Sequence, residues 1–438
     1  MVSRRTRAIR VGALGVVGLG LAFLMGASLI SRPSSVSSTS PVSAGDDSWK
    51  SPPPEPPPGL VIHEWGTFLG MSGSDGSSLD GMYHEEHALP AFVHTRSRDQ
   101  LRLPGSLLKG ETPVIYFYTD RPQSVRIGVR FPKGVWTQWY PQAVRVEPSL
   151  VQGAESPDRP GSGHICWHAD ILPPSLFEHR QTMKAAEIPS LPTTSADALW
   201  NFARNVDAAY VRCLDGTKTP AASEYERFLF YRGLGEARLP LRLDARQGGT
   251  LTADWESTIG EGIRHIFVLR VENGRGAYRY LPLLRPGQTA SSMIPAMDKA
   301  QPLAEFTRAV ASDLASRLEA SGLYAKEARA MVNTWTSSYF QTEGIRVLCV
   351  LPQSWTDHFI PMTVVPKPKQ VVRVMVGRVE LMIPERERQA GAAVRSLADP
   401  DGPRCLQAFA YLREQGRYVE PIIRRVQRTN DDENVRVL

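Results

Sequence analysis

The chain has 438 residues, of which 42% are hydrophobic and 22% are charged, as is usual for globular proteins. The formal net charge is +6, but residues 1–59 hold six basic and three acidic side chains, so the rest of the chain carries only +3. A charge this small and dispersed excludes the concentrated basic surface with which proteins bind nucleic acids.

Residues 1–30 have the features of a signal peptide or a membrane anchor. Val11 to Ile30 is an uncharged apolar run of 20 residues, which as a helix would be about 30 Å long, the thickness of a bilayer core. Four arginines precede it, so the N-terminus is expected in the cytoplasm and the rest of the chain outside. The run exceeds the usual length of a signal-peptide core. A retained anchor is therefore slightly favoured over a cleaved signal, and the membrane is an expected partner through residues 11–30.

Residues 31–59 form a linker rich in serine and proline. They include the stretches SRPSSVSSTSPVS and SPPPEPPP and almost no large apolar side chains. Such a segment cannot form a core, and its proline run favours an extended polyproline helix. We interpret it as a passive tether to the folded part of the chain, residues 60–438, which we call the body.

Strand patterns dominate residues 60–300. Val114 to Tyr118 is a run of β-branched and aromatic residues, and apolar residues alternate with others along 126–131 and 238–243, as in antiparallel sheets with one buried face. His265 to Glu272 and Arg275 to Leu283 flank Asn273-Gly274, a strong signal for a two-residue hairpin turn.

Helical periodicity becomes more frequent in residues 301–438. Stripes with helical spacing begin at Leu303 and Ala328, and the short link between them predicts an antiparallel helix pair. Further helices are expected from Pro384 and around Leu406, Phe409 and Leu412. Within the β-rich part, one helix is expected from the stripe Leu199, Phe202, Val206 and Tyr210.

These patterns predict an α+β fold. The N-terminal part, residues 60–300, is expected to be β-rich with antiparallel strands. The C-terminal part, residues 301–438, is expected to be mixed α/β with a helical hairpin, either as a separate domain or as one continuous domain with the first.

The four cysteines allow one or two disulfides. An even number in an exported chain permits three connectivities, and proximity in the sequence slightly favours Cys166–Cys213 and Cys349–Cys405. A free buried thiol is an equal alternative for Cys349, because it lies within the apolar run VLCVL.

One short stretch has the residue types of a metal site. In the sequence HICWHAD, a strand would place His164, Cys166, His168 and Asp170 on one face. Imidazole and thiolate groups are ligands for zinc or copper, so His164, Cys166 and His168 are the candidate metal ligands. The more ordinary interpretation is a half-buried strand with a polar outer face.

Two other histidine motifs carry weaker signals. His84 and His87 flank two glutamates, but zinc proteases need histidines four apart on a helix, so a solvated loop is favoured. His63 and Glu64 in HEWGTF would point to opposite faces of a strand unless Gly66 bends it. We interpret this segment as part of the core or edge of a sheet. Charged clusters at Glu226-Arg227, Tyr231-Arg232 and Arg373/Arg378/Glu380 are interpreted as paired charges, with anion binding as the alternative.

Five blocks of the sequence carry a resemblance. These are IHEWGTF (62–68), ETPVIYFY (111–118), RFLFYRGLG (227–235), GIRVLCVLP (344–352) and RVMVGRVE (373–380). With them the chain resembles a family of uncharacterised exported bacterial proteins whose body opens with HEWGTF. The resemblance covers Val61 to Pro421. It implies one continuous unit in the bacterial cell envelope, with the body on the extracytoplasmic side, and it supplies no catalytic residues.

Three functions are then compared. The first is an envelope protein, anchored in the inner membrane, with a binding or structural role toward an unidentified protein or glycan. The second is a metal-dependent envelope hydrolase that uses His63 or the face from His164 to His168. The third is an anion or glycan binder that uses Trp136, Trp139, Tyr231 and Arg232. Whether the protein is an enzyme stays open.

Overall fold

The computed structural model describes residues 59–82, 84–96, 107–148, 162–178, 189–213, 223–397 and 402–429. They belong to one compact unit, Pro53–Leu438. The predicted anchor and nearly all of the linker lie outside the described residues. Among the described residues, no helix has both the length and the apolar character needed to cross a membrane.

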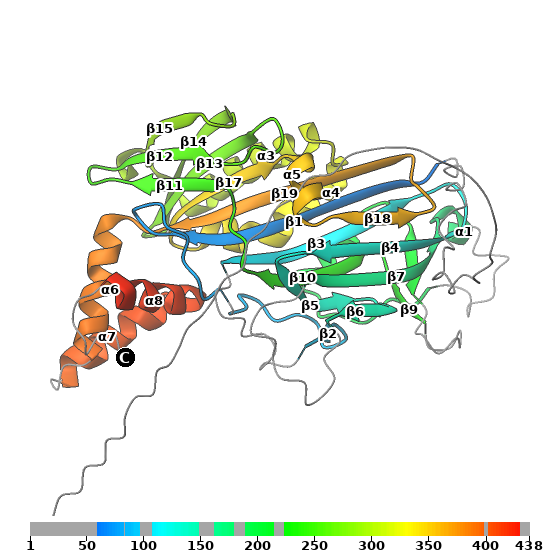
Figure 1. Cartoon of the computed structure of the whole chain (residues 1–438), viewed down its shortest axis with the longest axis horizontal. Coiled ribbons are helices and arrows are strands. Elements are labelled where there is room, and N and C mark those ends of the chain that lie inside the picture. Colours follow the sequence, from blue (N-terminus) through cyan, green and yellow to red (C-terminus); the bar gives the residue numbers. More distant parts are fainter. Residues whose placement is uncertain are drawn as a thin grey trace, which may run out of the picture. The chain divides into compact units, whose positions relative to one another are not determined.

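The fold is α+β, as predicted, and it is organised around a large twisted sheet (Figure 1). Within the described residues this sheet has ten strands. In spatial order they are β16 (Gln301–Pro302), β14 (Arg275–Leu284), β13 (Ile263–Glu272), β17 (Gly344–Leu351), β19 (Gln370–Leu381), β1 (Val61–Ser72), β3 (Leu108–Tyr118), β10 (Leu229–Gly235), β5 (Gly134–Tyr140) and β2 (His94–Thr95).

The centre of this sheet joins the two ends of the body. β1 pairs in parallel with β19, some 300 residues later in the chain, and in antiparallel fashion with β3. Strands from residues 60–300 and from 301–438 therefore share one sheet. β1 is buried on both faces, as is usual for a strand with a parallel partner in the middle of a sheet.

Two smaller sheets complete the β structure. One consists of β11 (Leu241–Ala245), β12 (Thr250–Trp255) and β15 (Thr289–Met293). In the other the order is β18 (Met362–Val365), β4 (Gln123–Phe131), β7 (Gly163–Leu172), β8 (Tyr210–Cys213) and β9 (Glu224–Glu226), and β6 (Arg145–Glu147) also pairs with β7.

The longer helices all lie in the C-terminal part. They are α1 (Ser175–Glu178), α2 (Trp200–Arg204), α3 (Leu303–Ala320), α4 (Ala325–Thr336), α5 (Gln353–Phe359), α6 (Pro384–Leu397), α7 (Gly402–Glu414) and α8 (Val419–Thr429). The single turns η4 (Met297–Lys299) and η6 (Gly416–Tyr418) are 3₁₀ helix, and α4 continues into a π-helical turn, η5 (Ser337–Gln341).

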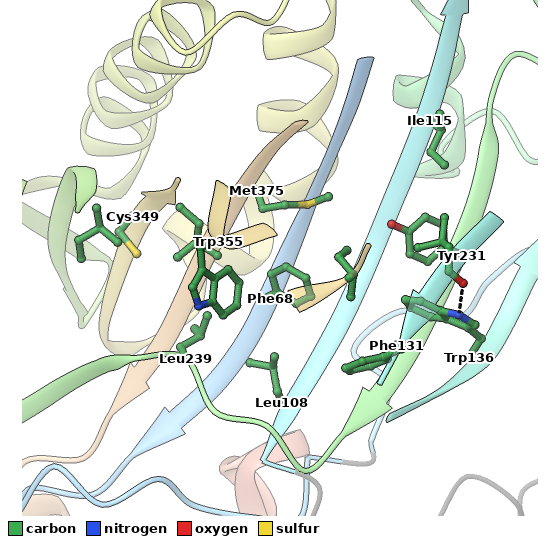
Figure 2. Close-up of a cluster of buried hydrophobic side chains, with 14 of the residues drawn as sticks. Phe68, Leu108, Ile115, Phe131, Trp136, Tyr231, Leu239, Cys349, Trp355 and Met375 are labelled. Atoms are coloured by element: carbon green, nitrogen blue, oxygen red, sulfur yellow. Dashed lines mark hydrogen bonds between the residues drawn. The ribbon is translucent and has the colours of Figure 1, made fainter. Parts of the chain in front are cut away.

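Each face of the large sheet supports its own core. On one face, Trp65 and Val114 pack with the helices α2, α3 and α4. On the other, Phe68 and Tyr231 pack with side chains of the smaller sheets. Figure 2 shows part of this cluster, in which the rings of Phe68 and Trp355 lie nearly perpendicular to each other. A third cluster packs α6 to α8 against the ends of β1 and β19.

Several local predictions are confirmed. The hairpin β13–β14 turns at Asn273 and Gly274, both with positive φ, the conformation that the two central residues of a type I′ turn adopt. α3 and α4 form the predicted pair and bury their apolar stripes, Phe306 to Leu318 and Ala328 to Trp335.

The helix expected over 199–210 is wrong in extent. α2 has only five residues, and Tyr210 begins strand β8. Burial of Trp200 and Ala203 fixes this single turn. The chain then enters the sheet, where pairing with β7 outweighs the helical spacing of the apolar residues.

The predicted disulfides are also wrong, since all four cysteines are free thiols. Cys213 lies opposite Ala169 on β7, three residues from Cys166. An offset of three positions separates the pair by about 10 Å along the strand and places them on opposite faces of the sheet. Cys349 lies in the core on β17, whereas Cys405 lies on α7.

Candidate functional site

The histidine and glutamate of HEWGTF point to opposite faces of the large sheet. His63 Nδ1 lies 2.8 Å from the carboxylate of Glu327 on α4. On the other face Glu64 accepts hydrogen bonds from Tyr231 and from Arg373 of the neighbouring strand β19. His63 and Arg373 are each only 1% exposed, and the other side chains of this group are fully buried. The motif is thus part of the core, as interpreted, and it forms no joint His–Glu site.

A pocket of about 580 Å³ lies on the helix side of the sheet. Its walls come from β1, β3 and β10, from the end of α4, from residues 193–203 and from the loop 85–91. This volume lies within the range of typical small-molecule sites. Five aromatic side chains line it, namely Trp65, Trp200, Phe228, Phe230 and Trp335.

The strand periodicity explains how β10 contributes to this pocket. Phe228, Phe230 and Arg232 are spaced by two residues and therefore share a face, and all three line the pocket. Tyr231, between them, points into the opposite core. Of the residues predicted for an anion or glycan site, Arg232 alone lines this pocket, because Trp136 and Tyr231 are buried core residues and Trp139 packs against the same core.

Apart from the exposed Asp197, the charged side chains of the pocket belong to a chain of ion pairs, called the buried chain because all its members except Glu85 and Glu86 are buried. Positive and negative groups alternate along eight contacts that join β17, β19, the loop 84–87, η6, β3 and β10. In order, the members are Arg346, Glu380, Arg378, Glu86, Arg417, Glu111, Lys109, Glu85 and Arg232. Glu85, Glu86, Glu111 and Arg232 also line the pocket.

These contacts keep the buried carboxylates ionised. Burial alone would raise the pKa of Glu111, but the charges of Arg417 and Lys109 outweigh it and lower that pKa to about 2. Likewise, Arg346 and Arg378 overcome the burial of Glu380 and lower its pKa to about 2. For Lys109, burial lowers the pKa; the attraction of Glu85 and Glu111 opposes this, while the like charges of Arg232 and Arg417 add to it.

Three hydrogen-bond donors of the residues that line the pocket have no acceptor among the described residues. They are Nε1 of Trp65, Nε of Arg232 and Nε1 of Trp335. Such buried donors are uncommon in folded proteins, and each costs about 1–3 kcal/mol. The walls of the pocket therefore combine aromatic surface with buried donors that lack an acceptor among the described residues.

The predicted metal ligands lie elsewhere. His164, Cys166 and His168 share the outer face of β7, as the strand alternation predicts, with His168 exposed and the other two half-buried. His164 Nδ1 lies 3.5 Å from Glu147. In the part of the chain that the structure describes, no three His, Cys, Asp or Glu side chains are arranged to hold a metal ion. Zinc or copper binding by these residues stays a prediction.

The loop from His84 to His87 contributes more than its sequence indicated. The first residue of this loop is solvent-exposed, as expected, since His84 lies at the surface beside Glu420. Its two glutamates, however, reach the buried cations of three strands and η6, and His87 lines the pocket. Two adjacent acidic residues in a loop carry no signal of this role, because their partners Lys109, Arg378 and Arg417 are distant in the sequence.

Comparison with models of known protein families gives no match, and comparison with curated protein sequences gives no significant similarity. The pocket and the chain of ion pairs are therefore the observations from which a function can be argued.

Proposed function

We propose that the protein is a bacterial envelope protein, exported and anchored in the inner membrane, whose body binds a small molecule in the aromatic pocket. The anchor, the location and the family resemblance rest on the sequence of residues 1–59 and on the five blocks described above. The binding role rests on the pocket itself, and the observation that carries it is the combination of five aromatic side chains with three buried donors that lack an acceptor among the described residues.

A metal-dependent hydrolase is the weaker alternative. His164, Cys166 and His168 do not line the aromatic pocket. His63, the other histidine considered, is buried against Glu327 and Tyr324. A substrate in the pocket would thus meet none of the residues on which the hydrolase hypothesis depends.

Ligand screening by thermal shift tests the binding role. The purified full-length chain in mild detergent is heated with a panel of small organic molecules, and hits are repeated with Ala198→Phe and Ala392→Phe. Ala198 is a half-buried residue of the pocket wall, so a phenyl ring there fills the space. Ala392 is exposed on α6 outside the pocket, which makes it a matched control.

The proposal predicts hits that stabilise the wild type and Ala392→Phe but not Ala198→Phe, because bound ligand stabilises the folded state by mass action. Hits that stabilise all three proteins equally would place binding elsewhere and contradict it. A panel without hits would count against a binding role.

A further inference from the structure

We propose that the ligand of this pocket is an organic anion, a carboxylate or phosphate group on a ring-shaped body, and that Arg232 pairs with the acidic group. This inference deepens the proposed function and rests on it. It follows from the charge of the buried chain, from the state of Arg232 and from the aromatic walls.

The buried chain of ion pairs has one more positive than negative member. It begins at Arg346 and ends at Arg232, and along it each glutamate lies between two cations. Arg346 is satisfied at its end by the carbonyl groups of Tyr339, Thr342 and Glu343. Both terminal arginines share their carboxylate with a second cation, but Arg232, at the end that meets the pocket, lacks such backbone acceptors for its guanidinium among the described residues.

Arg232 itself has fewer partners than a buried guanidinium needs. It is 4% exposed and contacts Glu85 and the side-chain oxygen of Gln138, while Nε has no acceptor among the described residues. Its one carboxylate partner, Glu85, is shared with Lys109. A second acidic group at this point would complete the alternation of charges, and a planar guanidinium is suited to a carboxylate or a phosphate.

The acidic side chains of the lining do not oppose such a ligand. Glu85 is paired with Lys109 and Arg232, Glu86 with Arg378 and Arg417, and Glu111 with Arg417 and Lys109. Asp197 is exposed. The glutamate carboxylates that line the cavity are thus already paired with cationic side chains of the protein.

The remaining walls favour a ring. Trp65, Trp200, Phe228, Phe230 and Trp335 offer flat surfaces on which an aromatic ring or the apolar face of a sugar can stack.

Isothermal titration with matched probes tests the inference. Benzoate and phenyl phosphate are compared with neutral benzamide, and glucuronate with neutral glucose, on the full-length chain at low ionic strength. The aromatic and sugar arms distinguish the two kinds of ring. The variants are Arg232→Gln, Arg232→Lys, Glu85→Gln and the surface control Arg388→Gln, whose side chain is exposed on α6.

We expect an anionic probe to bind at least tenfold more tightly than its neutral partner, since a hydrogen bond to a charged group contributes about 1.5–3 kcal/mol. Arg232→Gln should remove that preference, Arg232→Lys should retain part of it, and Arg388→Gln should leave it unchanged. Glu85→Gln should strengthen anion binding, because it removes the carboxylate with which the ligand competes for Arg232. This gain separates a binding role of Arg232 from a purely structural one.

Equal binding of the charged and neutral probes would overturn the inference and leave the proposed function standing. An anion preference that survives in Arg232→Gln, with the variant folded by circular dichroism, would also overturn it. Absence of binding by every probe would contradict both the inference and the binding role.

Discussion

At the scale of single residues, burial gives the polar side chains of HEWGTF their roles. Glu64 is fully buried between Tyr231 and Arg373. Arg373 contacts Asp357 as well, but that carboxylate is half exposed, and Nη2 of the arginine has no acceptor among the described residues. Glu64 is consequently the main counter-charge of a buried guanidinium at the centre of the large sheet.

Replacement of Glu64 by glutamine should therefore be costly. It leaves the Arg373 charge buried with less compensation, and removing one partner of a buried ion pair costs about 3–5 kcal/mol. The free energy of unfolding, measured with urea, checks this. Glu261→Gln, which breaks an exposed pair with Arg264, should change it by less than about 1 kcal/mol. Equal effects of the two substitutions would contradict the role assigned to Glu64.

The buried glutamates of the charge chain predict acid sensitivity. The folded state lowers the pKa of Glu111 and Glu380 from 4.5 to about 2, so between these values the unfolded chain binds more protons. Their stabilisation is complete above about pH 5 and is lost as the pH falls toward 2. Urea unfolding at a series of pH values should show this loss. Glu111→Gln should be less stable at pH 7 but should lose less on acidification than the wild type; an unchanged slope would contradict the assignment.

At the scale of secondary-structure elements, the sequence predicted best what local patterns decide. The Asn273-Gly274 hairpin and the pair α3 and α4 follow from turn chemistry and from helical spacing. The prediction over 199–210 failed because pairing of β8 with β7 outweighs helical spacing. The parallel pairing of β1 with β19 had no local signal, since it joins strands from opposite ends of the body.

The same distinction applies to the candidate site. Arg232 could be singled out from the cluster Tyr231-Arg232, but the choice between a paired charge and an anion site could not be made. Its partner Glu85 lies 147 positions away, and the pocket depends on segments that only the fold brings together. The metal motif on β7, in contrast, was visible because its spacing is local.

α7 gives a prediction at this scale. The helix expected around Leu406, Phe409 and Leu412 is present, but only Leu412 of the three is buried: it is 3% exposed, whereas Leu406 and Phe409 are 71% and 58% exposed. Leu412→Ala should therefore lower the free energy of unfolding by about 2–5 kcal/mol, and Phe409→Ala should change it by no more than about 0.5 kcal/mol. Urea unfolding of both variants checks this. A large loss for Phe409→Ala would show that its face is covered in the folded protein.

At the scale of the whole molecule, the proposed anchor determines whether the pocket is held at the membrane. If residues 11–30 are retained, the mature protein should begin before Val11, fractionate with membranes and need detergent for release. Mass spectrometry of the N-terminus and fractionation of cells check this. A mature N-terminus beyond Ile30, with the protein in the soluble fraction, would show a cleaved signal and leave export as the surviving part of the proposal.

The central claim is that the aromatic pocket at the end of the buried charge chain is a binding site. A crystal structure of the protein soaked with benzoate tests it most directly. The account predicts density in the pocket, with the carboxylate at Arg232 and the ring against the aromatic walls. Benzoate bound only outside the pocket, or an empty pocket at saturating benzoate, would contradict it.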